Sequence, residues 1–168
     1  MTIVAIMGYP AAGKTSQVKE YTEQGFIRLN RDLQGRSIKD LHNELESKLK
    51  DGEVNFVLDN TYPTIASRAK LIELGKEYRV DVHCVHVTTS IGDAQVNACR
   101  RMMQRYGRIL EPDDIKEIKD PNCFPVSVQY RYRKQFEKPT TKEGFRKVIN
   151  APFQRVWEDK YTNCLHWQ

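Results

Sequence analysis

The stretch TIVAIMGYPAAGKT, residues 2–15, decides the fold class. Residues 2–6 form a short apolar run, which predicts a buried parallel strand. Residues 8–15 follow the pattern Gly-x-x-x-x-Gly-Lys-Thr of a phosphate-binding P-loop. Gly8 and Gly13 let the chain wrap a phosphate, so that backbone N–H groups and the start of the next helix point at the anion. The sequence therefore predicts a P-loop at the end of the first strand.

The P-loop pattern also predicts which side chains contact a donor nucleotide. Lys14 is expected to reach the β and γ oxygens, and the Thr15 hydroxyl is expected to bind Mg²⁺. The residues predicted to bind the nucleotide, taken as ATP, are Gly8, Ala11, Ala12, Gly13, Lys14, Thr15 and Ser16.

Length and composition predict one soluble globular domain over residues 1–168, with 39% hydrophobic and 29% charged residues. No apolar stretch approaches the length of a membrane span, so we expect no contact with a membrane. The first strand runs directly into the P-loop, so we expect no cleavable signal segment and an intracellular protein. A formal charge of +5 is compatible with a polyanionic partner but is also common in proteins that bind none.

Apolar runs and helical periodicities alternate along most of the chain. Strands are expected at residues 26–29, 54–58, 80–87 and 144–149, and helices at residues 15–24, 37–50, 64–78 and 91–106. This alternation predicts an α/β fold of the P-loop NTPase and kinase type, a parallel sheet covered by helices on both faces. Ligands then bind at the carboxyl ends of the strands. Valines alternate with polar residues in 80–87, which predicts a less buried strand.

Two carboxylates follow predicted strands and therefore belong to the loops that face the P-loop. Asp59 ends the strand at 54–58 in the position of a Walker B carboxylate, which reaches Mg²⁺ directly or through water. Asp32 follows the strand at 26–29, where it can accept the proton of an incoming hydroxyl. Either aspartate can instead cap a helix or a turn.

Taken together, the motifs resemble one family, the polynucleotide 5′-kinase domain of DNA-repair polynucleotide kinase/phosphatases and phage RNA-repair kinases. The resemblance covers nearly the whole chain and depends on the order and spacing of its motifs. These motifs are residues 8–15, Asn30-Arg31-Asp32, residues 58–63 with Ser67-Arg68, Asn97-Ala98-Cys99-Arg100, and residues 132–139 with 143–145.

The resemblance implies a role for several individual residues. Asp32 would be the general base for the 5′-hydroxyl, and Arg100 would be a lid arginine on the donor phosphates, in a lid region around residues 97–135. Arg31 would contact a phosphate of the acceptor strand, and Asp59 with Thr61 would line the acceptor site. The implied catalytic residues are therefore Lys14, Asp32 and Arg100. The implied Mg²⁺ ligands are Thr15 and Asp59.

The function favoured by the resemblance is an ATP-dependent polynucleotide 5′-hydroxyl kinase, a transferase that repairs the 5′ ends of DNA or RNA. The chain contains no Asp-x-Asp, which the phosphatase partner of the bifunctional members needs, so we expect kinase activity alone. A kinase of a small hydroxyl-bearing metabolite or nucleoside is the alternative, since the same loop and carboxylates serve many acceptors. A nucleotide-gated switch is a third class; the Asn-Lys-x-Asp that recognises guanine is absent.

The segment between Arg101 and Phe124 looks longer than in the repair enzymes of the family. Arginines and tyrosines interleave in and beyond it, including Arg105, Tyr106 and Arg108. This composition is consistent with binding a single-stranded backbone through phosphate contacts and base stacking. It is equally consistent with a solvated helical face.

Overall fold

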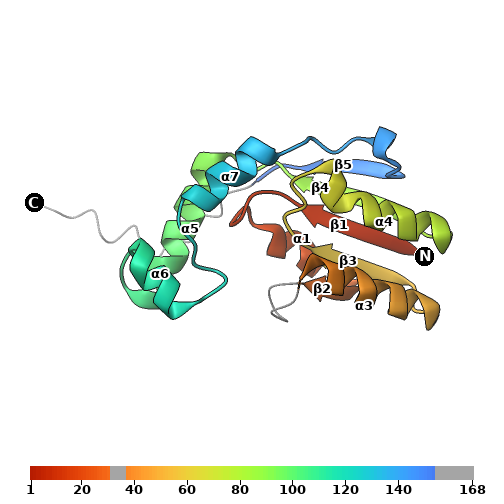
Figure 1. The fold of residues 1–168 in the computed structure, drawn as a ribbon, viewed down its shortest axis with the longest axis horizontal. Helices are drawn as coiled ribbons and strands as arrows, with labels where there is room; N and C mark the ends of the chain where they lie inside the picture. The colour runs from red at the N-terminus through yellow and green to blue at the C-terminus, as the bar shows by residue number, and fades with distance from the viewer. Residues whose placement is uncertain (31–36, 154–168) are drawn as a thin grey trace, which may run out of the picture.

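The structure is a computed structural model that describes residues 1–30 and 37–153. Its centre is a five-stranded parallel sheet with the order β2-β3-β1-β4-β5. The strands are β1 (Thr2–Met7), β2 (Ile27–Asn30), β3 (Asn55–Asp59), β4 (Asp81–Val87) and β5 (Lys147–Ala151). All strands run in one direction, so their carboxyl ends lie at one edge of the sheet (Figure 1).

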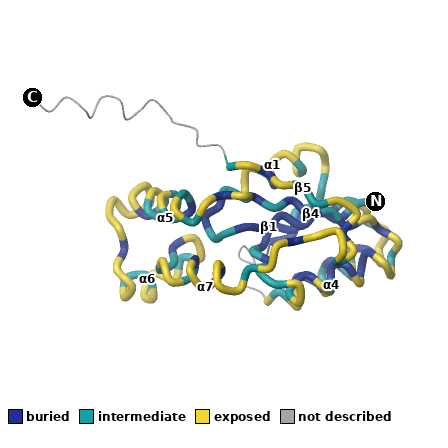
Figure 2. The backbone as a smooth tube through the Cα atoms, turned by 90° about the horizontal axis from the view of Figure 1, so that it is seen from above, coloured by how far each residue is buried: buried dark blue, intermediate teal, exposed yellow. Residues whose placement is uncertain are grey.

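Helices cover both faces of this sheet, as the sequence predicts. Helices α3 (Ile38–Lys50) and α4 (Ile65–Glu77) bury their leucines against one face, in the core cluster that also holds Phe56 and Leu58. Helix α1 (Lys14–Glu23) covers the other face through Val18. In Figure 2, the buried strands lie between α1 and α4. The predicted α/β fold is therefore confirmed.

Local signals explain where these helices begin. Ser37 and Thr64 each accept a hydrogen bond from the backbone N–H three residues later, in capping boxes that start α3 and α4. The observed helix bounds lie close to the predicted ones. The last strand is the exception, because the 3₁₀ helix η1 (Thr141–Glu143) ends at Gly144 with φ +114° and delays β5 to residue 147.

The prediction of a less buried fourth strand is confirmed. Asp81 is exposed and His83 and His86 are half-buried, whereas β1 and β3 are buried after their first residue. β4 nevertheless lies inside the sheet, between β1 and β5, and the His86 ring stacks on Phe136 at 5.0 Å. Burial lowers the pKa of His86, which favours the neutral imidazole. The polar alternation therefore marked the positions of β4 that stay partly exposed.

Three further helices lie beyond the carboxyl ends of the strands (Figure 1). They are α5 (Ile91–Tyr106), α6 (Pro112–Ile118) and α7 (Ser127–Gln135). A small separate core formed by Met102, Leu110 and Cys123 packs this region together. It includes the predicted lid region, residues 97–135, whose role as a lid stays a prediction. Among the described residues, no helix combines the length and apolar composition that a membrane crossing needs.

Candidate active site

The P-loop connects β1 to α1 and has the backbone conformation that phosphate binding requires. Ala11 and Gly13 have left-handed backbones, with φ +64° and +87°, which lets the loop curl. Gly8 packs so tightly on Val87 that an added Cβ would lie 2.9 Å from the Val87 carbonyl oxygen. The Lys14 ammonium donates hydrogen bonds to the carbonyls of Tyr9 at 2.9 Å and Gly8 at 3.3 Å, which holds it across the loop.

A cleft of about 510 Å³ opens over this loop at the carboxyl edge of the sheet. It brings together most of the residues that the sequence predicts for the site. Those predicted residues that line it are Ala11, Ala12, Gly13, Lys14, Thr15, Asp59 and Thr61. Gly8, the first residue of the loop, and Ser16, in the first turn of α1, are not among the residues that line the cleft. Arg31 and Asp32 lie outside the described residues, so their roles stay predictions.

Asp59 is buried at the bottom of the cleft and is paired with an arginine that the sequence analysis did not identify. Arg28 donates from Nη2 to Asp59 Oδ2 at 2.6 Å, and Asn30 donates from Nδ2 to the same oxygen at 3.0 Å. Arg28 and Asn30 are two positions apart on β2, so they project from the same face of the strand. Two polar residues spaced by two on one strand, together with a carboxylate at the end of the next strand, could have predicted the contact of Arg28 with Asp59.

The donor set of the cleft is suited to magnesium. Thr15 offers a hydroxyl and Asp59 a carboxylate, and both line the same cleft. Hard oxygen ligands of this kind, few in number and completed by phosphates and water, are what Mg²⁺ uses in phosphate-transfer sites. Among the described residues, no three His, Cys, Asp or Glu side chains form a metal cluster.

The helices beyond the sheet contribute a second group of cationic and aromatic side chains. Arg101 from α5 and Arg131 from α7 line the cleft, together with Phe124 and Tyr132. Burial lowers the pKa of the Arg101 guanidinium, and the nearby Asp59 carboxylate opposes this effect. Arg100, which the resemblance implies as the lid arginine, is exposed and does not line the cleft among the described residues. Its contact with donor phosphates stays a prediction.

We expect Arg101→Ala to slow phosphoryl transfer more than Arg100→Ala, because the half-buried guanidinium of Arg101 already lies at the cleft. The expected loss of kcat/KM is about tenfold to a hundredfold for Arg101→Ala. Arg101→Lys should restore only part of it, since an ammonium lacks the planar fork that binds two phosphate oxygens. Steady-state rates of the three variants give the answer. A large loss in Arg100→Ala alone would restore the assignment implied by the resemblance.

The arginines at the end of α5 and just beyond it are paired inside the chain. Arg105 forms an ion pair and hydrogen bond with Asp120, and Arg108 binds both carboxylate oxygens of Asp114, at 2.6 and 2.8 Å. The hydrogen bond from Arg108 lowers the pKa of Asp114 to about 2. Asp120 and Asp114 therefore neutralise these two arginines, whereas Arg101 and Arg131 line the cleft.

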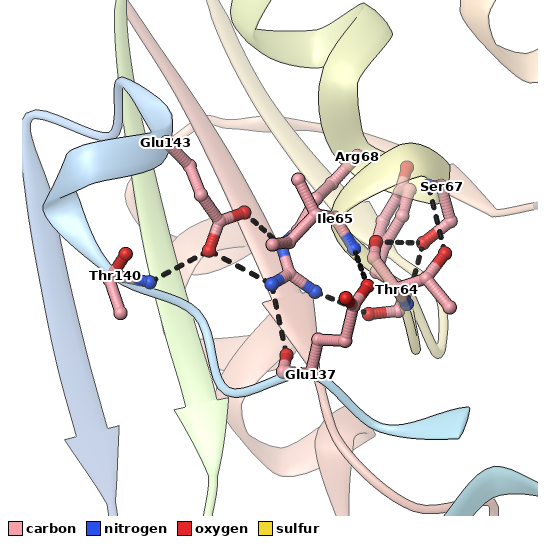
Figure 3. Close-up of polar contacts among 8 residues, drawn as sticks. Thr64, Ile65, Ser67, Arg68, Glu137, Thr140 and Glu143 are labelled. Atoms are coloured by element: carbon pink, nitrogen blue, oxygen red, sulfur yellow. Dashed lines mark hydrogen bonds and ion pairs between the residues drawn. The ribbon is translucent and has the colours of Figure 1, made fainter.

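A buried arginine fixes the loop that carries Asp59 and Thr61. Figure 3 shows the Arg68 guanidinium enclosed by Glu137 and Glu143. Arg68 is fully buried; it pairs with the Glu143 carboxylate and donates to the carbonyls of Glu137 at 2.9 Å and Tyr62 at 3.3 Å. Tyr62 has φ +42° and directly follows Thr61. Arg68 thus joins the end of the β3–α4 loop to the chain that leaves α7.

Replacing Arg68 with methionine is expected to lower the free energy of unfolding by about 3–5 kcal/mol, since it leaves the Glu143 carboxylate buried without its partner. Urea denaturation at constant slope measures this loss as a lower midpoint. Arg146→Met, at an exposed arginine, is the matched control and should stay within about 0.5 kcal/mol of the wild type. Equal midpoints for Arg68→Met and the wild type would show that the Arg68 network adds no net stability.

Known proteins similar to this chain include kinases. No protein-family model matches the chain. The chain is 28% identical over 162 residues to the bifunctional polynucleotide phosphatase/kinase of Schizosaccharomyces pombe, an alignment that covers 95% of the chain and 36% of that protein. The chain spans about a third of the length of the curated relatives it matches. The resemblance stated from the sequence motifs is thus confirmed.

Solved structures show the fold. Kti12 of Chaetomium thermophilum, in complex with ADP-AlF3, superposes with a TM-score of 0.61 at 15% identity, over 95% of this chain and 91% of that one. A gluconokinase from Sinorhizobium meliloti 1021 superposes with a TM-score of 0.57 at 15% identity, over 92% and 84%. The chain therefore has the fold of P-loop kinases. Together with the curated relatives, this fold supports a P-loop kinase.

Proposed function

We propose that this chain is an ATP-dependent polynucleotide 5′-hydroxyl kinase that repairs the ends of DNA or RNA inside the cell. One observation carries the proposal. The P-loop lysine, a buried carboxylate, two arginines of the predicted lid region and two aromatic rings all line a single cleft. A phosphate-bearing donor and a phosphate-bearing acceptor end both need cations there, and aromatic rings can stack on acceptor bases. The named activity of the curated relative is of the same kind.

On the donor side, the chemistry depends mainly on the placement of charge. ATP is the proposed donor, as the ADP-AlF3 in the Kti12 structure suggests for a loop of this fold. Lys14 binds the β and γ oxygens and stabilises the charge that spreads over the transferred group. Thr15 and Asp59 would hold Mg²⁺, which when bound neutralises further charge on these phosphates. Arg101, or Arg100 as the resemblance implies, supplies a cation from the lid region.

On the acceptor side, the 5′-oxygen attacks the γ-phosphorus of ATP. The bond between the γ-phosphorus and the β–γ bridging oxygen breaks, and ADP leaves. Asp32 accepts the proton of the attacking hydroxyl, and Arg31 binds a phosphate of the acceptor strand. The strand that leads to both residues ends at Asn30, whose amide is bonded to Asp59 in the cleft. Arg31 and Asp32 follow Asn30 directly in the sequence, which supports these proposed roles.

The alternative is a kinase of a small hydroxyl-bearing metabolite or nucleoside. A cleft of about 510 Å³ is within the size range of small-ligand pockets, which favours this second candidate on volume alone. Arg131 also lines the cleft and is exposed, and a further cation of this kind fits an acceptor that carries phosphates of its own.

Incubation with γ-labelled ATP tests the proposal directly. We expect label to transfer to single-stranded DNA or RNA oligonucleotides with a 5′-hydroxyl, and not to the same oligonucleotides carrying a 5′-phosphate. A panel of nucleosides and sugar acids runs in parallel. Transfer to a panel member but to no oligonucleotide establishes the alternative, and nucleotide binding without any transfer establishes a binding module.

A further inference from the structure

Side chains from outside the P-loop hold three successive carbonyl groups of this loop, at residues 10–12. Gln129 Nε2 donates to the carbonyl of Pro10 at 3.1 Å, and Asn97 Nδ2 donates to that of Ala11 at 3.0 Å. Thr89 Oγ1 donates to the carbonyl of Ala12 at 2.7 Å. These contacts span 77 to 119 residues of sequence, so the fold, and not the loop itself, supplies them.

Two of the three donors come from the helices beyond the sheet. Asn97 belongs to α5 and Gln129 to α7. The ring of Tyr132, also on α7, packs on Tyr9 of the loop with 4.8 Å between centroids. The helices that carry the cleft arginines are therefore bonded to the loop that would bind the donor phosphates.

Burial of the Gln129 side chain is energetically unfavourable, which indicates that its hydrogen bond to Pro10 has a specific role. The side chain is completely buried, and its amide oxygen has no hydrogen-bond partner in the part of the chain that the structure describes. Burying an unsatisfied amide oxygen is unfavourable, whereas an apolar side chain of this size would avoid the cost. The orientation is set by Pro10, because the flipped amide would face one carbonyl oxygen with another.

A peptide group is planar, so a carbonyl held in place also fixes the direction of the N–H of the next residue, which points the opposite way. A carbonyl that turned inward would meet the phosphate with a negative dipole, whereas outward carbonyls at Pro10 and Ala12 leave the N–H groups of Ala11 and Gly13 for the anion. The peptide group held by Asn97 acts differently, because its N–H, that of Ala12, donates to the Tyr9 carbonyl at 3.0 Å and closes the turn of the loop. Ala11, held by Asn97, has the left-handed φ of +64° that non-glycine residues disfavour. The loop thus keeps a conformation that it would not hold as well alone.

We propose that Asn97 and Gln129 are positioning residues that couple the docking of α5 and α7 to nucleotide binding in the P-loop. The proposal rests on the nucleotide site of the proposed function, but not on its acceptor. Because coupling is reciprocal, docked helices raise nucleotide affinity, and bound nucleotide stabilises the docked helices.

Gln129→Met keeps the length and packing of the side chain but removes the donor. We expect it to weaken binding of ADP or ATP, measured by calorimetry, by about fivefold to a hundredfold. KM for the oligonucleotide should change little. The rise in melting temperature that nucleotide causes in the wild type should shrink, and so should the nucleotide-induced protection of α7 amides in hydrogen exchange.

Asn97→Ala, at a half-buried position of α5, is the second variant and should show the same pattern if Gln129→Met fails to fold. Gln104→Met, on the exposed face of α5, is the control and should match the wild type throughout. A structural role alone would lower the melting temperature without nucleotide and leave the nucleotide-induced rise intact. That result, or wild-type nucleotide affinity in folded Gln129→Met or Asn97→Ala, would overturn the coupling.

The outcomes also separate this inference from the proposed function. If the wild-type chain binds nucleotide but labels no oligonucleotide, the proposed acceptor is wrong while the coupling is still tested by affinity and exchange. If the wild-type chain binds no nucleotide, both proposals fail.

Discussion

Turnover of Lys14→Ala is expected to fall by about a hundredfold to a thousandfold, with a much smaller loss of ATP affinity. The P-loop holds the Lys14 ammonium at hydrogen-bond distance from the Gly8 and Tyr9 carbonyls, at the floor of the cleft. The charge of Lys14 stabilises the transition state most strongly, because negative charge spreads there over the oxygens of the transferred phosphoryl group. Single-turnover transfer measured beside ATP affinity separates the two effects.

Lys19→Ala is the matched control for this variant. Lys19 lies one turn further along α1, exposed and paired with Glu23 at 3.7 Å, so its loss should leave turnover unchanged. If Lys14→Ala turned over at the wild-type rate, the P-loop would not be the donor site and the proposed function would lose its basis.

Asp32→Asn is expected to lower phosphoryl transfer by about a hundredfold or more while ATP and oligonucleotide still bind. The substitution keeps the shape of the side chain and removes its capacity to accept the hydroxyl proton. The residue follows β2, whose last side chain, Asn30, is bonded to Asp59 in the cleft. A rapid-quench measurement with saturating substrates reports the transfer step alone.

Arg31→Ala provides the contrast for Asp32→Asn. Loss of a phosphate contact should weaken oligonucleotide binding and reduce its salt dependence, with little effect on ATP affinity. Should Asp32→Asn turn over normally, the base would have to be another carboxylate, and Asp59 is the one that lines the cleft. Should it abolish ATP binding, Asp32 would act on the donor side.

Short-range patterns were enough to predict the five strands of the sheet and helices α1, α3, α4 and α5, but not the shorter helices α6 and α7. The P-loop is recognised from a contiguous pattern, and the capping residues Ser37 and Thr64 act within a single turn, so a short stretch of sequence was enough to predict each of them. Strand-ending polar residues were enough to predict that Asp59 and Thr61 lie near the P-loop, because parallel strands end at one edge. The place of β4 inside the sheet was not predictable, since its neighbour β5 and the Phe136 ring that stacks on His86 come from far along the chain.

The sequence by itself therefore determined the P-loop, the alternation of strands and helices, and the family that the chain resembles. Only the tertiary structure decided that Arg28 pairs with Asp59, that Arg101 lines the cleft, and that Gln129 bonds to Pro10. The physical reason is the separation of the partners along the chain, which is 31 residues for Arg28 and Asp59 and 119 residues for Pro10 and Gln129. Contacts of this kind depend on how whole elements pack, and no local periodicity records them.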